Sequence, residues 1–122
     1  MSNSVWSDEV AWAKAKEQIK TALRITAQVH GKVISYTDLS ARVTAVPLDA
    51  HSPLLPHILG EVSTEENVAG RGMLTVLVVR RGETMPVKGF FELARKLGRT
   101  GSDMDIWIAE LKKVHDANKV MK

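Results

Sequence analysis

The sequence predicts a mainly helical α+β domain with a small antiparallel β-hairpin and two helices after it. Three observations support this class. Apolar residues recur at helical spacing in several stretches, one β-branched run stands in the second half of the chain, and glycines or prolines separate these stretches. With 122 residues, 44% of them hydrophobic, the chain can bury a core without disulfides or metals. We therefore interpret residues 1–122 as one domain.

The first predicted helix covers about residues 8–29. Ser7 can cap it, and Asp8 and Glu9 fall in its first turn, where the helix dipole favours acidic side chains. Gly31 follows the last apolar residue of the stripe and is a typical stop signal.

An edge strand and two further helices are predicted next. Residues 33–36 are β-prone, and Thr37 with Asp38 can open a short helix. Another helix begins at Ser52 and Pro53, because proline at the first helical position loses no hydrogen bond. This helix carries an apolar stripe and several acidic residues.

The segment GRGMLTVLVVRRGETMPVKGFF, residues 70–91, is predicted to fold back on itself as a hairpin. Residues 73–81 form a strand that is apolar on both faces and hence covered on both sides. Residues 81–84 turn, and residues 85–87 return as a short edge strand. A phosphate-binding loop is excluded, because its glycines would have to follow a strand and open a helix.

Two helices complete the predicted order. One starts after Gly89, and the last opens at Ser102 with Asp105 three residues on, as in a capping box. The order of the earlier elements matches a winged helix-turn-helix domain. The winged-helix-like portion spans about residues 8–91, and the C-terminal helices span about residues 89–118.

Composition excludes several classes of function. The chain has no cysteine, which excludes disulfides, thiolate zinc sites and cysteine nucleophiles and suits a reducing cytoplasm. Its start, MSNSVWSDEV, lacks the basic and apolar regions of a signal peptide. No apolar stretch approaches the roughly 20 residues of a membrane span. We therefore expect a cytoplasmic location and no membrane partner.

Charged residues are unevenly distributed along the chain. Residues 71–99 are rich in lysine and arginine, whereas every charged residue of 49–66 is acidic. This pattern indicates a basic end and an acidic end of the molecule. The basic residues that we expect to contact phosphates are Arg71, Arg80, Arg81 and Lys88.

Candidates for catalysis or metal binding are few. His57 and Glu61 lie four residues apart and share a helical face, but two ligands are too few for a metal site. No motif for a nucleophile is present. We expect no catalytic residue, metal or cofactor. An enzymatic alternative would need His51, His57 and Glu61 to converge in one pocket.

One segment resembles a known family of DNA-binding proteins. GKVISYTDLSARV, residues 31–43, is similar to the segment that opens the DNA-binding half of alkylguanine alkyltransferases and alkyltransferase-like proteins. The resemblance implies a winged helix-turn-helix. That family carries a Pro-Cys-His-Arg segment, whereas this chain has Val78-Val79-Arg80-Arg81 in the comparable region and no cysteine. Alkyl transfer is therefore excluded, and the resemblance extends to the fold alone.

A second resemblance covers more of the chain. GRGMLTVLVV with MPVKGFFELARKLG looks like a group of small bacterial proteins with the pattern G-R-x-M-L, then M-P-x-x-G-F-F-x-L-A. The likeness spans about residues 31–111. It implies a bacterial origin and a compact domain, and it brings no catalytic residues with it.

These observations predict noncovalent binding, with nucleic acid as the first partner and the basic hairpin as a wing along its backbone. One observation opposes DNA binding, because the third helix is acidic and has no lysine or arginine. The alternative is a protein-interaction module or homodimeric adaptor without a nucleic-acid role. In that case the interaction surface is the apolar N-terminal segment around Val5 and Trp6.

Overall fold

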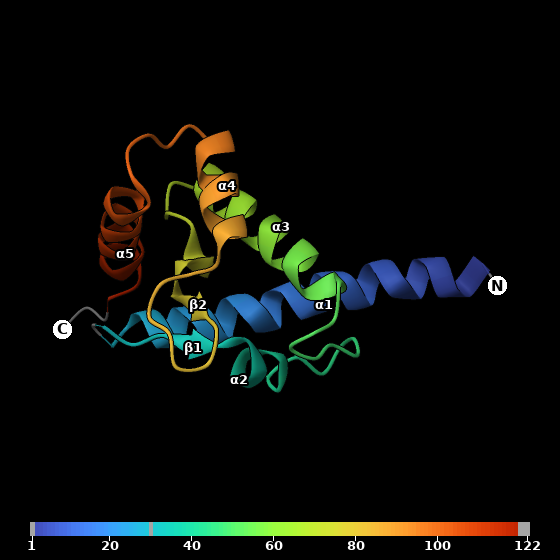
Figure 1. Ribbon diagram of the computed structural model, residues 1–122. Helices are drawn as coiled ribbons and strands as arrows, with labels where there is room; N and C mark the ends of the chain where they lie inside the picture. Colours follow the sequence, from blue (N-terminus) through green and yellow to red (C-terminus); the bar gives the residue numbers. More distant parts are fainter. Residues whose placement is uncertain (1, 30, 120–122) are drawn as a thin grey trace.

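The computed structural model describes residues 2–29 and 31–119, and within α1 the side chains from residue 9 onward. This part of the chain is mainly helical with a two-stranded sheet (Figure 1). The elements in chain order are α1 (Ser2–Ala27), β1 (Ile34–Ser35), α2 (Tyr36–Ser40), α3 (Leu54–Val68), the 3-10 helix η1 (Leu74–Leu77), β2 (Val78–Val79), α4 (Lys88–Lys96) and α5 (Asp103–Asn118).

Helix α1 is the element on which much of the core is packed. Its small and branched apolar residues recur every three or four positions, and Ala15, Ile19 and Leu23 are fully buried. Helices α3 and α5 and the 3-10 helix η1 all pack on it. In Figure 1, α2 and the loop after it lie below α1, and α4 and α5 lie above it, while the N-terminal end of α1 projects away from the body.

The segment at residues 73–79 is the centre of the core. All seven residues are buried, and η1 contacts α1, α3 and α5. The prediction that this β-branched run is covered on both sides is therefore confirmed.

The conformation of this run differs from the predicted strand. Only Val78–Val79 is a strand, and Leu74–Leu77 is a 3-10 helix. The cause is the shortness of β1, which offers backbone partners to two residues only. Upstream of them the buried backbone groups need other partners, so the amide N–H of Val76 donates to the carbonyl oxygen of Met73 at 3.0 Å, and the Met73 N–H donates to a Glu110 carboxylate oxygen at 3.0 Å.

The predicted antiparallel hairpin is wrong, because the sheet is parallel. Strand β2 pairs with β1, with Ile34 opposite Val78 and Ser35 opposite Val79. Parallel strands need a long crossover connection, which α2 and α3 supply here. Residues 85–87 form no strand in the described part of the chain. The structure therefore confirms the helices and a small sheet, but not the paired wing.

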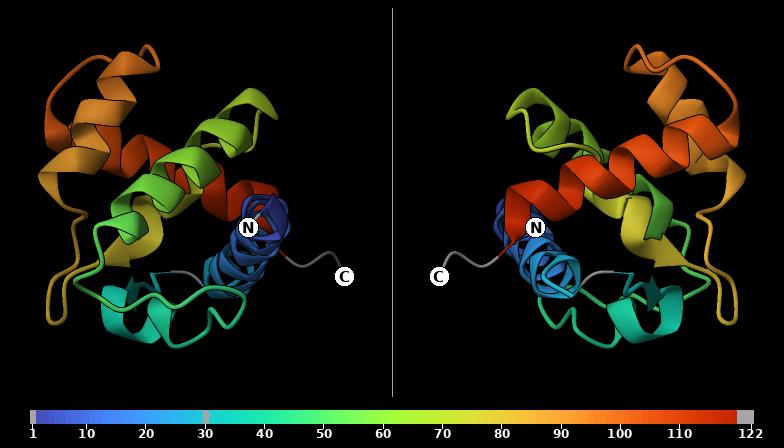
Figure 2. Two further views of the ribbon diagram at one scale, coloured as in Figure 1. Left: turned by 90° about the vertical axis from the view of Figure 1, so that its right-hand side faces the viewer. Right: turned by 90° about the vertical axis from the view of Figure 1, so that its left-hand side faces the viewer.

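The turn after β2 is present as predicted. The N–H of Glu83 donates to the carbonyl oxygen of Arg80 at 2.9 Å, and Gly82 takes a φ of +83°, which favours glycine. Beyond the turn, the chain folds back as a loop at one side of the molecule and leads into α4 without forming a second strand (Figure 2).

The helix ends confirm some predictions and shift others. The capping box of α5 is confirmed, with Ser102 accepting from the Asp105 N–H at 3.1 Å and Asp105 accepting from the Ser102 N–H at 3.2 Å. The short helix α2 begins earlier than predicted, because Ser35 caps it by accepting the Asp38 N–H. Helix α1 likewise begins before the predicted residue 8. None of the helices described is long and apolar enough to span a bilayer.

Candidate functional site

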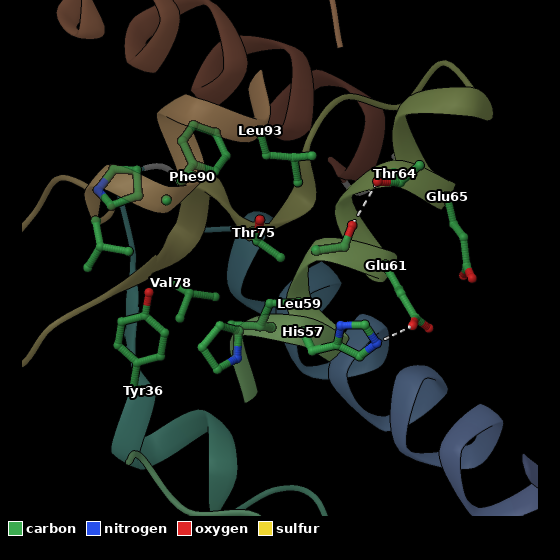
Figure 3. A pocket seen from close by; sticks show the side chains of 15 residues that line it. Tyr36, His57, Leu59, Glu61, Thr64, Glu65, Thr75, Val78, Phe90 and Leu93 are labelled. Carbon is green, nitrogen blue, oxygen red and sulfur yellow. Dashed lines mark hydrogen bonds and ion pairs between the residues drawn. The ribbon is translucent and has the colours of Figure 1, made fainter. Parts of the chain in front are cut away.

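A pocket of about 610 Å³ opens between α3, α4, the end of β2 and the start of α2 (Figure 3). Its wall is largely apolar, and its polar side chains stand at separate points of the rim and floor. The apolar lining residues are Pro56, Leu59, Val78, Pro86, Val87, Phe90 and Leu93. The polar ones are Tyr36, His57, Glu61, Thr64, Glu65 and Thr75, and Gly60 and Gly89 complete the lining.

The parallel sheet places Arg80, which does not line the pocket, beside Tyr36, which does. Because Ser35 pairs with Val79, the residues that follow, Tyr36 and Arg80, leave the same edge of the sheet as neighbours. Burial raises the pKa of the Tyr36 hydroxyl, and the charge of Arg80 opposes that rise in part. The hydroxyl therefore stays protonated, and it has no hydrogen-bond partner among the described residues.

The opposite side of the pocket carries a histidine and a carboxylate that face α1. His57 and Glu61 pair at 3.1 Å, as their shared helical face predicted. Glu61 also accepts a 2.8 Å hydrogen bond from the Trp12 indole, and Lys16 lies 3.4 Å from it. The Trp12 hydrogen bond and Lys16 hold the pKa of Glu61 below its usual value. This carboxylate is thus an ionised structural partner of α1.

The floor of the pocket is made of internally satisfied hydroxyls. The buried hydroxyls of Ser63 and Thr75 hydrogen-bond to each other. The Thr64 hydroxyl donates to the Gly60 carbonyl oxygen at 2.8 Å. Because these hydroxyls already have hydrogen-bond partners within the protein, the floor shapes the pocket but offers few polar groups to a ligand.

Only two of the three residues required by the enzymatic alternative meet in the pocket. His57 and Glu61 line the pocket, whereas His51 is exposed in the loop before α3 and does not line it. Among the described residues, no cluster of three or more histidine, aspartate or glutamate side chains is placed to hold a metal ion.

The four predicted phosphate-contacting residues divide into two groups. Arg71 is tied to Glu66 through two hydrogen bonds, at 3.0 and 2.8 Å. Arg80 and Arg81 are exposed and form no ion pair within the described chain, and the Lys88 side chain is 89% exposed with Glu92 only at 3.9 Å. We call residues 80–88, with these three cations, the basic loop.

The glutamates of α3 are paired with cations, mostly of α1, instead of forming the expected acidic end. Glu65 pairs with Lys16 and Lys20 of α1, and Glu66 pairs with Arg24 and Arg71. With Glu61 held by Lys16, each of these carboxylates has a basic partner. The sequence pattern showed the charges but not that they meet across two helices.

Two other predicted residues cannot be placed. Val5 and Trp6 fall in the first turns of α1, in the stretch whose side chains lie outside the description.

The pocket itself was missed by the sequence analysis. Its lining comes from four separate regions of the chain, so no local pattern marks it. The one available signal was Gly60, a glycine inside a predicted helix without a turn to explain it.

The chain was compared with known proteins in three ways. A scan against models of protein families, a search of curated proteins and a search of solved structures find no match. The inferences below therefore rest on the geometry of this chain.

Proposed function

We propose that this chain is a noncovalent binding domain that contacts the backbone of a nucleic acid through Arg80, Arg81 and Lys88. The observation that carries the proposal is the contrast among arginines. Arg24, Arg71, Arg95 and Arg99 are engaged by carboxylates, whereas Arg42, Arg80 and Arg81 are exposed and form no ion pair within the described structure. Of these three, only Arg80 and Arg81 are adjacent, and they share the basic loop with Lys88.

Two further features support this function. The basic loop contains a single carboxylate, Glu83, so its net charge is positive. The carboxylates of α3, which opposed DNA binding on sequence grounds, are neutralised by cations of α1 and by Arg71. Phosphate contacts by exposed arginine and lysine release counterions and give affinity without sequence preference.

The proposal does not need a winged helix. The basic loop presents its cations without a second strand, and backbone contacts require exposed charge more than a paired wing. A cytoplasmic location, expected from the lack of cysteine, belongs to the same proposal.

Removal of two charges from the basic loop tests the function. We expect the Arg80→Ala/Arg81→Ala variant to bind labelled oligonucleotides more weakly and about equally across sequences. Fluorescence anisotropy between about 50 and 200 mM salt should show the salt slope falling by about 1.4 to 1.8, since each lost phosphate contact removes about 0.7 (single strand) to 0.9 (duplex).

The matched control is Lys32→Ala/Arg42→Ala, which removes the same charge from two exposed residues outside the basic loop. This control should keep the salt slope of the parent protein. An unchanged affinity of the Arg80→Ala/Arg81→Ala variant, or an equal loss in both variants, would refute the assignment.

The second candidate is a protein-interaction module, and one observation favours it. Val29 and Ile108 are more than half exposed, and they line the same hollow between the end of α1 and α5. Exposed apolar residues that gather at one place often mark protein contacts. Sedimentation at two salt concentrations separates the candidates, because a concentration-dependent dimer that ignores oligonucleotides would replace the first proposal.

A further inference from the structure

The glycines of this chain point to the pocket as a site that is kept open. Six of the eight glycines take positive φ values, which explains their presence at turns and helix ends. The other two are Gly60 and Gly89, and both line the pocket.

Neither of these two glycines is explained by packing or backbone geometry. A Cβ atom at either position would meet no atom within 4 Å, and neither position has a positive φ. Gly60 lies inside α3, where glycine is about 0.5 to 1 kcal/mol less favourable than alanine. A glycine at each of these positions keeps that part of the pocket empty. We take this as the reason for glycine at both positions.

The wall of the pocket suits an apolar body. Leu59, Val78, Phe90 and Leu93 surround the space in Figure 3, and Pro86 and Val87 also belong to the lining. The volume of about 610 Å³ falls in the range of small-molecule sites, about 300 to 1,000 Å³. A ligand with a hydrocarbon or aromatic core therefore fits this lining.

The charges around the pocket favour an anionic group on that ligand. Glu61 and Glu65 already pair with Lys16 and Lys20, so a cationic ligand would find no free carboxylate there. At the other side, the Tyr36 hydroxyl is a donor without a described partner, and Arg80, an exposed residue outside the lining, follows the neighbouring strand beside it. An anion can accept from both groups.

We propose that the pocket binds a small organic acid, an aromatic or branched aliphatic carboxylate. Its apolar body lies between Leu59, Val78 and Phe90, and its carboxylate accepts from Tyr36 and Arg80. This site shares Arg80 with the proposed backbone contacts, whereas Arg81 and Lys88 belong to those contacts alone.

Two acids and one alcohol serve as probes. Isothermal titration calorimetry and saturation-transfer NMR should show saturable binding of naphthoate or isocaproate to the full chain, and weaker binding of naphthylmethanol. Arg80→Gln should weaken the acid by about tenfold, the size expected for a lost charge-assisted hydrogen bond, and leave the alcohol unchanged. Arg81→Gln, with the same loss of charge at the next residue, should leave both unchanged.

Filling the pocket tests the site itself. Gly60→Leu places a side chain where nothing now stands and should abolish binding of the acid, and thermal unfolding should show a stability no lower than that of the parent chain. Gly89→Leu is the second filling variant and should act in the same way. Gly60→Leu should also keep oligonucleotide binding, which separates this site from the backbone contacts.

Three results would overturn the proposal. The first is no saturable binding of either acid, and the second is undiminished acid binding by both folded filling variants. The third is loss of oligonucleotide binding in Gly60→Leu together with displacement of naphthoate by oligonucleotide, because the pocket would then hold part of the nucleic acid instead of a free acid.

Discussion

Glu66 shows how a single buried carboxylate organises its surroundings. Its side chain is only 1% exposed, and it accepts hydrogen bonds from Arg71 at the end of α3 and from Arg24 of α1. The Arg71 hydrogen bonds, assisted by the charge of Arg24, hold the pKa of Glu66 below its usual value. This residue therefore links α1 and α3 to Arg71, which lies just before the buried segment at residues 73–79.

We expect Glu66→Gln to destabilise the protein by about 1.5 to 3 kcal/mol, since hydrogen bonds to charged groups contribute amounts of this order. Urea unfolding followed by circular dichroism measures the change. Glu92→Gln is the control, because Glu92 is exposed and pairs only loosely with Lys88, and it should alter stability by less than about 0.5 kcal/mol. Equal effects of the two substitutions would show that the Glu66 cluster has no special role.

At the residue scale, the sequence predicted pairs close in the chain better than distant pairs. The spacing of His57 and Glu61 predicted their contact, because helical geometry places residues four apart side by side. The pairs between Lys16 and Glu65 or between Glu110 and Met73 join residues far apart in the sequence. No local pattern indicates such partners. Arg71 is a different case, because Glu66 lies only five residues before it and the turn at the end of α3 brings the two side chains together.

At the element scale, helix ends were predictable because they obey local chemistry. The capping box at Ser102 is an example, since both of its hydrogen bonds lie within four residues. The run at 73–79 is the counterexample. Its composition predicted burial correctly, but whether it becomes a strand or a 3-10 helix depends on the length of β1, about forty residues away.

Loss of the Ser102 cap should weaken α5. We expect Ser102→Ala to lower the free energy of unfolding by about 1 kcal/mol, the usual cost of removing an N-cap side chain. Ser102→Asp should retain most of the stability, because aspartate also accepts from the free N–H groups. Thermal unfolding of the two variants provides the measurement, and an alanine variant as stable as the aspartate variant would contradict the role of the cap.

At the scale of the whole molecule, ion pairs join helices α1 and α3. The pKa of each of Glu61, Glu65 and Glu66 lies below its usual value because of basic partners on α1 and Arg71. Burial alone would raise the pKa of Glu110, but Arg99 and the Met73 N–H more than offset it, so this pKa is also lowered. The glutamates of α3 are thus neutralised mainly by cations of α1, and Arg71 is the one residue of the basic stretch among their partners in the described structure.

Stability should therefore fall in acid. Carboxylates with lowered pKa contribute stability above the ordinary glutamate value of about 4.3 and lose it as the pH drops through their lowered values. We expect the melting temperature to decrease from about pH 5 downward, and more gently for Glu66→Gln than for the parent protein. A melting temperature that stays constant through this range, or identical pH profiles for the two proteins, would exclude this linkage.

The buried segment at residues 73–79 depends on contacts with residues both early and late in the chain. Strand β2 needs β1 from early in the chain, and the N–H of Met73 needs the carboxylate of Glu110 from near its end. During translation, the ribosome releases β1 and α1 long before α5 emerges. The Met73 N–H gains this partner only then, so we expect a nascent chain halted before Glu110 to be more susceptible to proteases at residues 73–79.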